Sequence, residues 1–396
     1  MGDRSVAIKL WFINVLTITA TVSIYVWCSY SVMQQYGSVF LASAIFSLQW
    51  IGPIFGFGYI NRLFKLYAAR KIVGFALCVI IGFQAVLLLD MNVYGPFFLA
   101  VVVGTAESVI KIARLIIIKR FVRPRLIGQV NSFSATGQFI GGALGGVVFA
   151  TTFAGFSGVL LPLCTLVFLF ASLLVTASLP REDLKTSIPP SSSTASQLRS
   201  VWSHVTTNIP LARALVGLLG VCALVQGFHN VARVGLPVDQ WSGDESVVGL
   251  LQSLVAAVTI AGALFYMLID RKLEVTRFVL PASTVVFLAL IGVSQTWEPL
   301  SGFVVYAILI FVFEYVFLFF QASVVQAADH DRSAEVFAFQ FLMINIGMFS
   351  AGLLGGAIAE TFGYPATAVI FATGFIASMM YARPRRSMQP STMPPN

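Results

Sequence analysis

The pattern Gly137-x-x-x-Gly141-Gly142-x-x-Gly145-Gly146 lies inside an apolar run, and 210 residues later it recurs as Gly347-x-x-x-Ala351-Gly352-x-x-Gly355-Gly356. Small residues at this spacing let two helices approach closely inside a membrane, so each copy predicts a tightly packed transmembrane helix. A motif repeated at a fixed offset is the signature of a duplicated unit. The two copies therefore predict a chain built of two related halves.

Two further matches support the duplication. Asn61-Arg62 corresponds to Asp270-Arg271 at an offset of 209 residues, and Glu107 corresponds to Glu314 at an offset of 207 residues. Internal repeats of this kind are typical of secondary transporters, whose substrate site lies where the two halves meet. We therefore expect a pseudo-symmetric chain with a site between its halves.

The composition is that of a membrane protein. Hydrophobic residues make up 58% of the 396 residues, charged residues only 10%, and the mean hydropathy is +0.89. Apolar runs of about twenty residues cross a bilayer as helices, in which every backbone group is satisfied. We predict an all-α polytopic membrane protein with twelve transmembrane helices in two pseudo-symmetric six-helix bundles. The expected spans are 10–32, 38–60, 72–92, 95–117, 128–152, 157–179, 211–234, 246–269, 278–295, 302–326, 337–359 and 365–382.

The net charge of +8 reflects topology rather than nucleic-acid binding. All Lys and Arg residues except Lys111, Arg114 and Arg233 fall on alternate loops or on the tails, which is the positive-inside pattern of cytoplasmic segments. With twelve spans, both termini are then cytoplasmic. We expect a multi-pass protein of the cell (cytoplasmic or inner) membrane that binds no nucleic acid.

The stretch from Pro180 to about Pro210 is polar, basic and rich in Pro and Ser, so it predicts a linker. It divides the chain into an N-terminal half (1–180), a cytoplasmic linker (181–210), a C-terminal half (211–383) and a cytoplasmic tail (384–396). The four cysteines lie in separate apolar runs without C-x-x-C spacing, which indicates neither disulfides nor a metal site. No H-E-x-x-H or G-x-S-x-G motif occurs, so we expect neither an enzyme nor a cofactor.

These features resemble the major facilitator superfamily over nearly the whole chain. The segment Gly58–Lys71 resembles the superfamily's Gly-x-Leu-x-Asp-Arg loop motif with Asn61 in place of the acid, while Asp270-Arg271 keeps the acidic form. The pattern that begins at Gly137 resembles the superfamily's antiporter motif, with Gly142 in place of proline. The resemblance implies the major facilitator fold, gating by these loops and by the glycine pattern, and transport out of the cell.

A second resemblance rests on a few spaced residues. Ala113-Arg114, Arg123-Pro124 and Asn131 resemble the branch of the superfamily that includes enterobactin-type siderophore exporters and multidrug efflux proteins. It implies a siderophore or a drug as the exported molecule.

Charged residues inside a membrane cost roughly 2.5–3.5 kcal/mol each on insertion scales, so each one needs an explanation. Glu107, Lys111 and Arg114 are spaced by four and seven residues, which places them on one face of a helix. We expect this face to line a cavity, where Lys111 and Arg114 bind substrate and Glu107 assists proton coupling. The alternatives are a structural Glu107–Lys111 ion pair and an Arg114 side chain that snorkels to the membrane interface.

Gln226, His229, Asn230 and Arg233 fall within one narrow sector of a second helix, and we assign them to substrate binding. An unperturbed histidine titrates near neutral pH, which would suit a proton-coupled site. The alternatives are a hydrogen-bonded histidine at a helix end and an Arg233 side chain that snorkels outward.

Three more intramembrane residues are candidates. Glu314 is surrounded by aromatic residues, and an apolar surround favours the neutral acid, so Glu314 is the stronger proton carrier, with a structural hydrogen bond as the alternative. Lys111, by contrast, should keep Glu107 ionised. Asn14 and Tyr30 in the first helix line the cavity in one interpretation, whereas an aromatic belt at the membrane interface explains Tyr30 in the other.

Together these residues predict a proton-coupled secondary transporter that exports a small, partly anionic organic molecule, such as a siderophore or metallophore, by alternating access. Lys111, Arg114 and Arg233 outnumber Glu107 and Glu314, and this balance favours anions. Broad-specificity drug efflux and import of an organic acid are the alternatives within transport. The expected partners are the substrate, protons and the lipid bilayer, for a chain that acts as a monomer.

Overall fold

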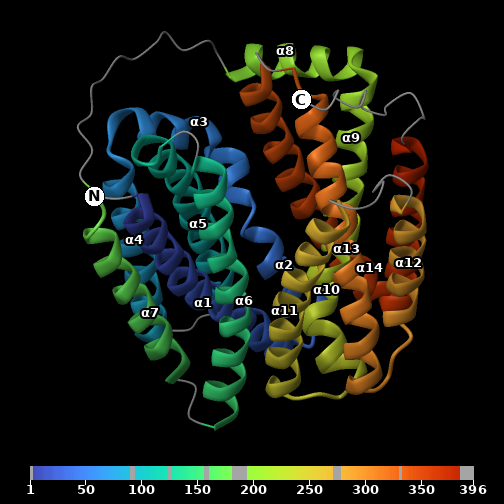
Figure 1. The fold of residues 1–396 in the computed structure, drawn as a ribbon. Helices are drawn as coiled ribbons and strands as arrows, with labels where there is room; N and C mark the ends of the chain where they lie inside the picture. The colour runs from blue at the N-terminus through green and yellow to red at the C-terminus, as the bar shows by residue number, and fades with distance from the viewer. Residues whose placement is uncertain are drawn as a thin grey trace.

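The computed structural model describes residues 3–89, 94–123, 126–155, 160–180, 194–270, 278–329 and 332–383, which are helical and contain no β-strand (Figure 1). The helices are α1 (Asp3–Tyr36), α2 (Val39–Leu48), α3 (Ile51–Leu66), α4 (Ala69–Leu89), α5 (Gly95–Phe121), α6 (Ile127–Gly155), α7 (Leu160–Ala177), α8 (Thr194–Thr207), α9 (Ile209–Leu219), α10 (Gln226–Gly235), α11 (Glu245–Asp270), α12 (Val279–Val293), α13 (Pro299–Ala327) and α14 (Ser333–Ala382). Two π-helical segments, η2 (Gly220–Val225) and η3 (Leu236–Gln240), continue α9 and α10.

The chain is a helical polytopic membrane protein, and its described helices are arranged as twelve passes. Within the described residues, seven helical stretches are long and apolar enough to cross a membrane, and Val279–Val293 is a shorter apolar helix. α2 and α3 together make the second pass, and the stretch from α9 to η3 makes the seventh. α14 makes the last two passes, because Gly363 has a φ of 81° and Pro365 follows it, so the chain turns back there.

The passes agree with the expected spans to within a few residues at most ends. The first pass is longer at its start, because the helix begins at Asp3, and the seventh continues to Gln240 instead of ending at residue 234. The expected linker also contains a helix, α8. Its Leu198, Val201 and Val205 form a stripe that packs on the C-terminal half. An apolar stripe at this spacing is enough to dock a short helix, although the surrounding composition is polar.

The bundle has two ends, named here the α8 end and the Gly37 end. The α8 end carries α8 and the turn at Tyr67–Ala68, and α8 lies across the top of the C-terminal helices in Figure 1. The Gly37 end carries Gly37, the turn Ser242–Asp244 and the turn at Gly363.

The two glycine patterns pack in matching ways. On α6, a Cβ atom added at Gly137, Gly141 or Gly145 would lie within 2.9 Å of an atom of α1, so this edge lets α6 touch α1. At the matching positions of α14, Gly347 meets Ala223 and Gly355 meets Val231 at 3.0 Å, so α14 touches the seventh pass in the same way. The first and seventh passes are therefore equivalent partners, as the duplication predicts.

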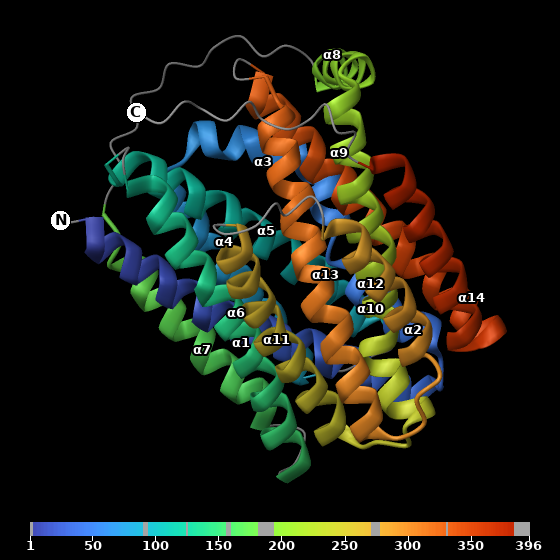
Figure 2. The ribbon, with the colours of Figure 1, turned by 45° about the vertical axis from the view of Figure 1, so that its right-hand side comes forward.

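The other edge of each pattern touches the opposite half. Gly142 and Gly146 of α6 face α11, where the added Cβ atoms would lie 3.5 Å from Ala256 Cβ and 2.6 Å from the Gly249 carbonyl oxygen. Gly352 and Gly356 of α14 face Ser47 and Ser43 of α2. Figure 2 shows α11 beside α6. The glycines thus allow close contact between the two groups of helices.

Candidate functional site

A cluster of polar and aromatic side chains lies where helices of both halves meet, and we call it the central cluster. Its members are Tyr25, Phe46, Glu107, Lys111, His229, Arg233 and Tyr306. They come from α1, α2 and α5 in one half and from α10 and α13 in the other. α10 packs against both α1 and α2, so it brings the two sets together.

Arg233 is the cation at the centre of this cluster. Its Cζ atom lies 3.0 Å from the centroid of the Phe46 ring, which is itself buried. A guanidinium over an aromatic face gains about 2 kcal/mol when the pair is desolvated. The Arg233 Nε atom has no hydrogen-bond partner, and no carboxylate among the described residues forms an ion pair with it. Arg233 therefore points inward instead of snorkelling outward.

Tyr25 connects this cation to the acid on α5. Its hydroxyl is buried without a hydrogen-bond partner, and both Glu107 and Arg233 lie within electrostatic range of it. Three helices, α1, α5 and α10, thus place polar groups close together across the two halves.

Glu107 and Lys111 form the ion pair that their spacing predicts. Lys111 Nζ lies 2.6 Å from Glu107 Oε1, one helical turn along α5. The Glu107 side chain is 12% exposed and that of Lys111, which lies one turn nearer to the α8 end, is 33% exposed. The opposite charges of this pair cancel, so Lys111 adds no net charge to the cluster.

His229 joins α10 to α13 by a side-chain hydrogen bond. Its Nδ1 atom and the Tyr306 hydroxyl are hydrogen-bonded at 2.7 Å, and both side chains are buried. Asn230, the next residue, is also buried, yet its Nδ2 atom has no partner. Gln226 lies one turn earlier on the same helix and is half-buried. The α10 residues that we assigned together to substrate binding therefore differ: His229 is hydrogen-bonded within the protein, whereas the Nδ2 donor of Asn230 has no partner.

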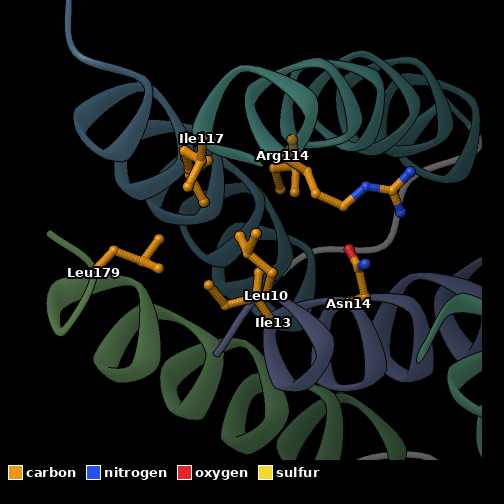
Figure 3. A pocket seen from close by; sticks show the side chains of 8 residues that line it. Leu10, Ile13, Asn14, Arg114, Ile117 and Leu179 are labelled. Atoms are coloured by element: carbon orange, nitrogen blue, oxygen red, sulfur yellow. The ribbon is translucent and has the colours of Figure 1, made fainter. Parts of the chain in front are cut away.

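Arg114 and Asn14 lie apart from the central cluster. Both line a small cavity with Leu10, Ile13, Val73, Ile110, Ile117 and Leu179, all from the N-terminal half (Figure 3). The cavity has room for about one water. Two guanidinium nitrogens of Arg114, Nε and Nη1, are buried without a partner, while Asn14 Nδ2 donates to the Ser134 carbonyl oxygen at 2.7 Å.

Tyr30 also lies elsewhere. Its hydroxyl donates to Glu245 Oε2 on α11 at 3.1 Å, and its ring packs on Phe149 at 5.8 Å between centroids. The residue therefore joins the two halves near the Gly37 end, one turn and a half beyond Tyr25 on α1.

Glu314 is buried in the C-terminal half. The residue is 5% exposed, and it packs where Gly262 lets α11 approach α13, since a Cβ atom on Gly262 would lie 3.0 Å from Glu314 Cβ. Cys222 of the π-helix η2 lies within electrostatic range of the carboxyl group. Among the described residues, no hydrogen-bond or ion-pair partner of Glu314 is found. Single π-helical turns inside α-helices are frequent at functional sites, and η2 adjoins this acid.

Three residues of interest were not predicted from the sequence: Phe46, Tyr306 and Asn345. Phe46 and Tyr306 gave no signal, because one Phe among 35 and one Tyr among 11 look alike until the helices are packed. Asn345 did carry a signal, as an amide in the apolar run 337–359. It is 1% exposed, and neither its oxygen nor its nitrogen has a partner.

The expected loop gate lies outside the part of the chain that can be described. The side chains of Asn61, Arg62 and Asp270 and the whole of Arg271 are not among the described groups. The glycines that we assigned to gating, Gly137, Gly141, Gly142, Gly145 and Gly146, are described and make the helix contacts given above.

No protein-family profile and no curated protein matches the sequence. Solved structures do match the fold. The nucleoside transporter NupG superposes with a TM-score of 0.71 at 15% identity, covering 96% of this chain and 100% of that one. The peptide transporter POT in complex with sulfate gives 0.72 at 13% identity, with 96% and 95% covered.

A bacterial homologue of the human lysosomal transporter Spinster gives a TM-score of 0.67 at 12% identity, with 96% of this chain and 94% of that chain covered. The likeness extends over the whole bundle in all three comparisons. The chain therefore has the major facilitator fold, with two pseudo-symmetric bundles of six transmembrane helices.

Proposed function

We propose that this chain is a proton-coupled secondary transporter that exports a small, partly anionic organic molecule, such as a siderophore or metallophore, by alternating access. It would act as a monomer in the cytoplasmic or inner membrane, with both termini cytoplasmic. The halves would be residues 1–180 and 211–383, joined by 181–210. The fold supports transport, because the similar structures named above are all described as transporters.

The observation that carries the substrate class is the excess of unpaired cations. Lys111 is neutralised by Glu107 at 2.6 Å, whereas Arg114 and Arg233 have no carboxylate in ion-pair range among the described residues. A buried guanidinium without an anion is costly, and an anionic substrate would relieve that cost. Arg233 is the better placed of the two, because it lies between the halves, where a substrate group would meet both.

The contacts between the halves support alternating access. Near the Gly37 end, Tyr30 bonds Glu245, Ser38 bonds Glu360, and Gly146 of α6 meets Gly249 of α11.

At the α8 end, two hydrogen bonds each stay within one half. Lys9 Nζ donates to the Ser178 carbonyl oxygen at 2.7 Å, and Asn208 Nδ2 donates to the Ala327 carbonyl oxygen at 3.3 Å. This arrangement fits a state that is closed at the Gly37 end, with the gate around Asn61, Arg62, Asp270 and Arg271 belonging to the other end.

Proton coupling would fall mainly to Glu314, with Glu107 as a second acid. Glu314 is buried, and no cation among the described residues forms an ion pair with it, so its charged form is poorly stabilised in place. Such a group changes its protonation when its surroundings change, which is the property that a coupling site needs.

The test is flux in proteoliposomes that contain the full chain. Citrate, a polycarboxylate chelator, and ethidium, a lipophilic cation, are loaded separately, and flux is followed with and without a pH gradient. We expect gradient-dependent citrate flux that Arg233→Gln abolishes and that Arg199→Gln, on the exposed face of α8, leaves unchanged. Ethidium flux without citrate flux would favour broad drug efflux instead. Citrate uptake in symport with protons would favour import of an organic acid.

A further inference from the structure

The second pass begins at the contact between the two halves. Ser38 is the N-cap of α2, with φ of −104° and ψ of 113°, and its Oγ atom accepts a hydrogen bond from the Leu41 backbone N–H at 3.1 Å. Such a cap satisfies only one of the backbone N–H groups that the first turn of a helix leaves without partners.

Glu360 of α14 supplies the missing acceptor from the other half. Its Oε2 atom accepts from Ser38 Oγ at 2.6 Å and from the Phe40 backbone N–H at 2.7 Å. A carboxylate at this point also meets the positive end of the helix dipole. The side chain thus does for α2 what an acid in a capping box does for its own helix, but it belongs to a different half.

The equivalent helix in the second half is capped differently. α11 follows Asp244, whose Oδ1 atom accepts from the backbone N–H groups of Ser246 at 3.0 Å and Val247 at 3.2 Å. The Ser246 hydroxyl bonds the same oxygen, and this bond lowers the pKa of Asp244. α11 is therefore capped by its own chain segment, whatever the position of the other half.

The residue that matches Glu360 across the duplication, at the offset of 210, is Ala150 on α6. It packs against Gly249 of α11, where a Cβ atom on the glycine would lie 2.5 Å from Ala150 Cβ. One interface thus closes by contact between small residues, while its counterpart closes by a carboxylate that caps a helix. The helices approach each other closely at both interfaces, so the two interfaces differ in the chemistry of the contact and not in the distance between the helices.

We propose that Glu360 is a latch between the two halves: it completes the start of α2 only while the Gly37 end is closed. Opening that end removes the acceptor from Ser38 and from the Phe40 N–H and exposes both to water. The closed state gains the energy of a helix cap, which α11 receives in every state. The consequence for transport rests on the alternating access proposed above, whereas the latch itself concerns only the distance between two helices.

The test measures that distance directly. Spin labels are placed at Gln35 and Phe362, exposed positions of the two halves at the Gly37 end, in the full chain with its four native cysteines replaced. Distances are recorded by pulsed electron paramagnetic resonance in lipid nanodiscs, without substrate or pH gradient. Glu360→Ala should raise the ratio of open to closed molecules about five-fold, the factor for one typical helix cap.

The matched control is Glu298→Ala, since Glu298 is an exposed acid at the same end that precedes α13 and has no described contact with the other half. Ser38→Ala should open the pair by a similar factor, and the double variant with Glu360→Ala should add little. An unchanged distance distribution in Glu360→Ala, or an equal shift in Glu298→Ala, would overturn the latch. Because no transport is measured, a wrong substrate class would leave this result intact.

Discussion

Replacing Gly146 by alanine should open the Gly37 end, because this glycine lies at a close backbone contact between α6 and α11. A Cβ atom at residue 146 would lie 2.6 Å from the Gly249 carbonyl oxygen and 2.8 Å from the Ser253 backbone nitrogen. Ordinary contact begins near 3.4 Å, so the two backbones must separate locally by the difference, about 0.8 Å. The atoms concerned are backbone, which cannot rotate away as a side chain could.

Overpacking of this kind costs about 1–3 kcal/mol, and the cost falls only on the state in which the two helices touch. The ratio of open to closed molecules should therefore rise by roughly 5- to 150-fold. The spin-label pair at Gln35 and Phe362 reports this ratio as the population of long distances.

Gly142→Ala is the matched control. It lies one turn earlier on the same face of α6, but its added Cβ atom would be 3.5 Å from Ala256 Cβ, an ordinary contact. Both substitutions raise the helix propensity of α6 by the same amount, about 1 kcal/mol, so that effect cancels in the comparison. Equal distance distributions for the two variants would refute the reasoning, since only one of them is expected to clash.

Three further outcomes are expected. Cysteines placed at Ser187 and in the loop 90–94 should react with an impermeant reagent from opposite sides of the membrane, and reaction from one side would contradict the twelve-pass topology. Lys111→Ala should abolish substrate flux because it leaves Glu107 as an unpaired buried charge. Removing one partner destabilises a fully buried ion pair by about 3–5 kcal/mol, and this partly exposed pair by less. If Glu107→Gln combined with Lys111→Gln restores flux, the pair is structural, whereas continued loss indicates that Lys111 contacts the substrate. Glu314→Gln should keep substrate exchange in proteoliposomes but lose its response to a pH gradient, and an unchanged response would exclude Glu314 as the proton carrier.

Most of the fold could be predicted from the sequence because the bilayer imposes one simple rule on every pass. A run of about twenty apolar residues has to be helical, and the repeated glycine pattern relates the fifth pass to the eleventh. The π-helical segment Gly220–Val225 could not be predicted, since its residues are as apolar as those of a regular helix. The helix α8 could not be predicted for the opposite reason, because the apolar stripe of Leu198, Val201 and Val205 lies in a stretch rich in serine and threonine.

The candidate site was predictable only where one helix determines the geometry. The Glu107–Lys111 ion pair is present because a spacing of four residues places the two groups together on any α-helix. Its spacing places Arg114 on the same face of α5 as this pair. Residues of α1 and α4 nevertheless enclose Arg114 in a separate cavity. The contacts of Arg233 with Phe46 and of His229 with Tyr306 join different helices, and a single sequence does not reveal which helices meet.

The cap on α2 has a consequence for biosynthesis. The carboxylate of Glu360 follows the groups that it binds by more than 300 residues, so it leaves the ribosome only after ten passes have been made. Until then the first turn of α2 has Ser38 alone, and its Phe40 N–H must bond water or lipid headgroups. During synthesis the N-terminal helices therefore lie in the membrane with one helix end that lacks its second acceptor. The insertion of α14 then supplies this acceptor. If the two halves were synthesised as separate polypeptides, this helix end would be a point at which each could recognise the other.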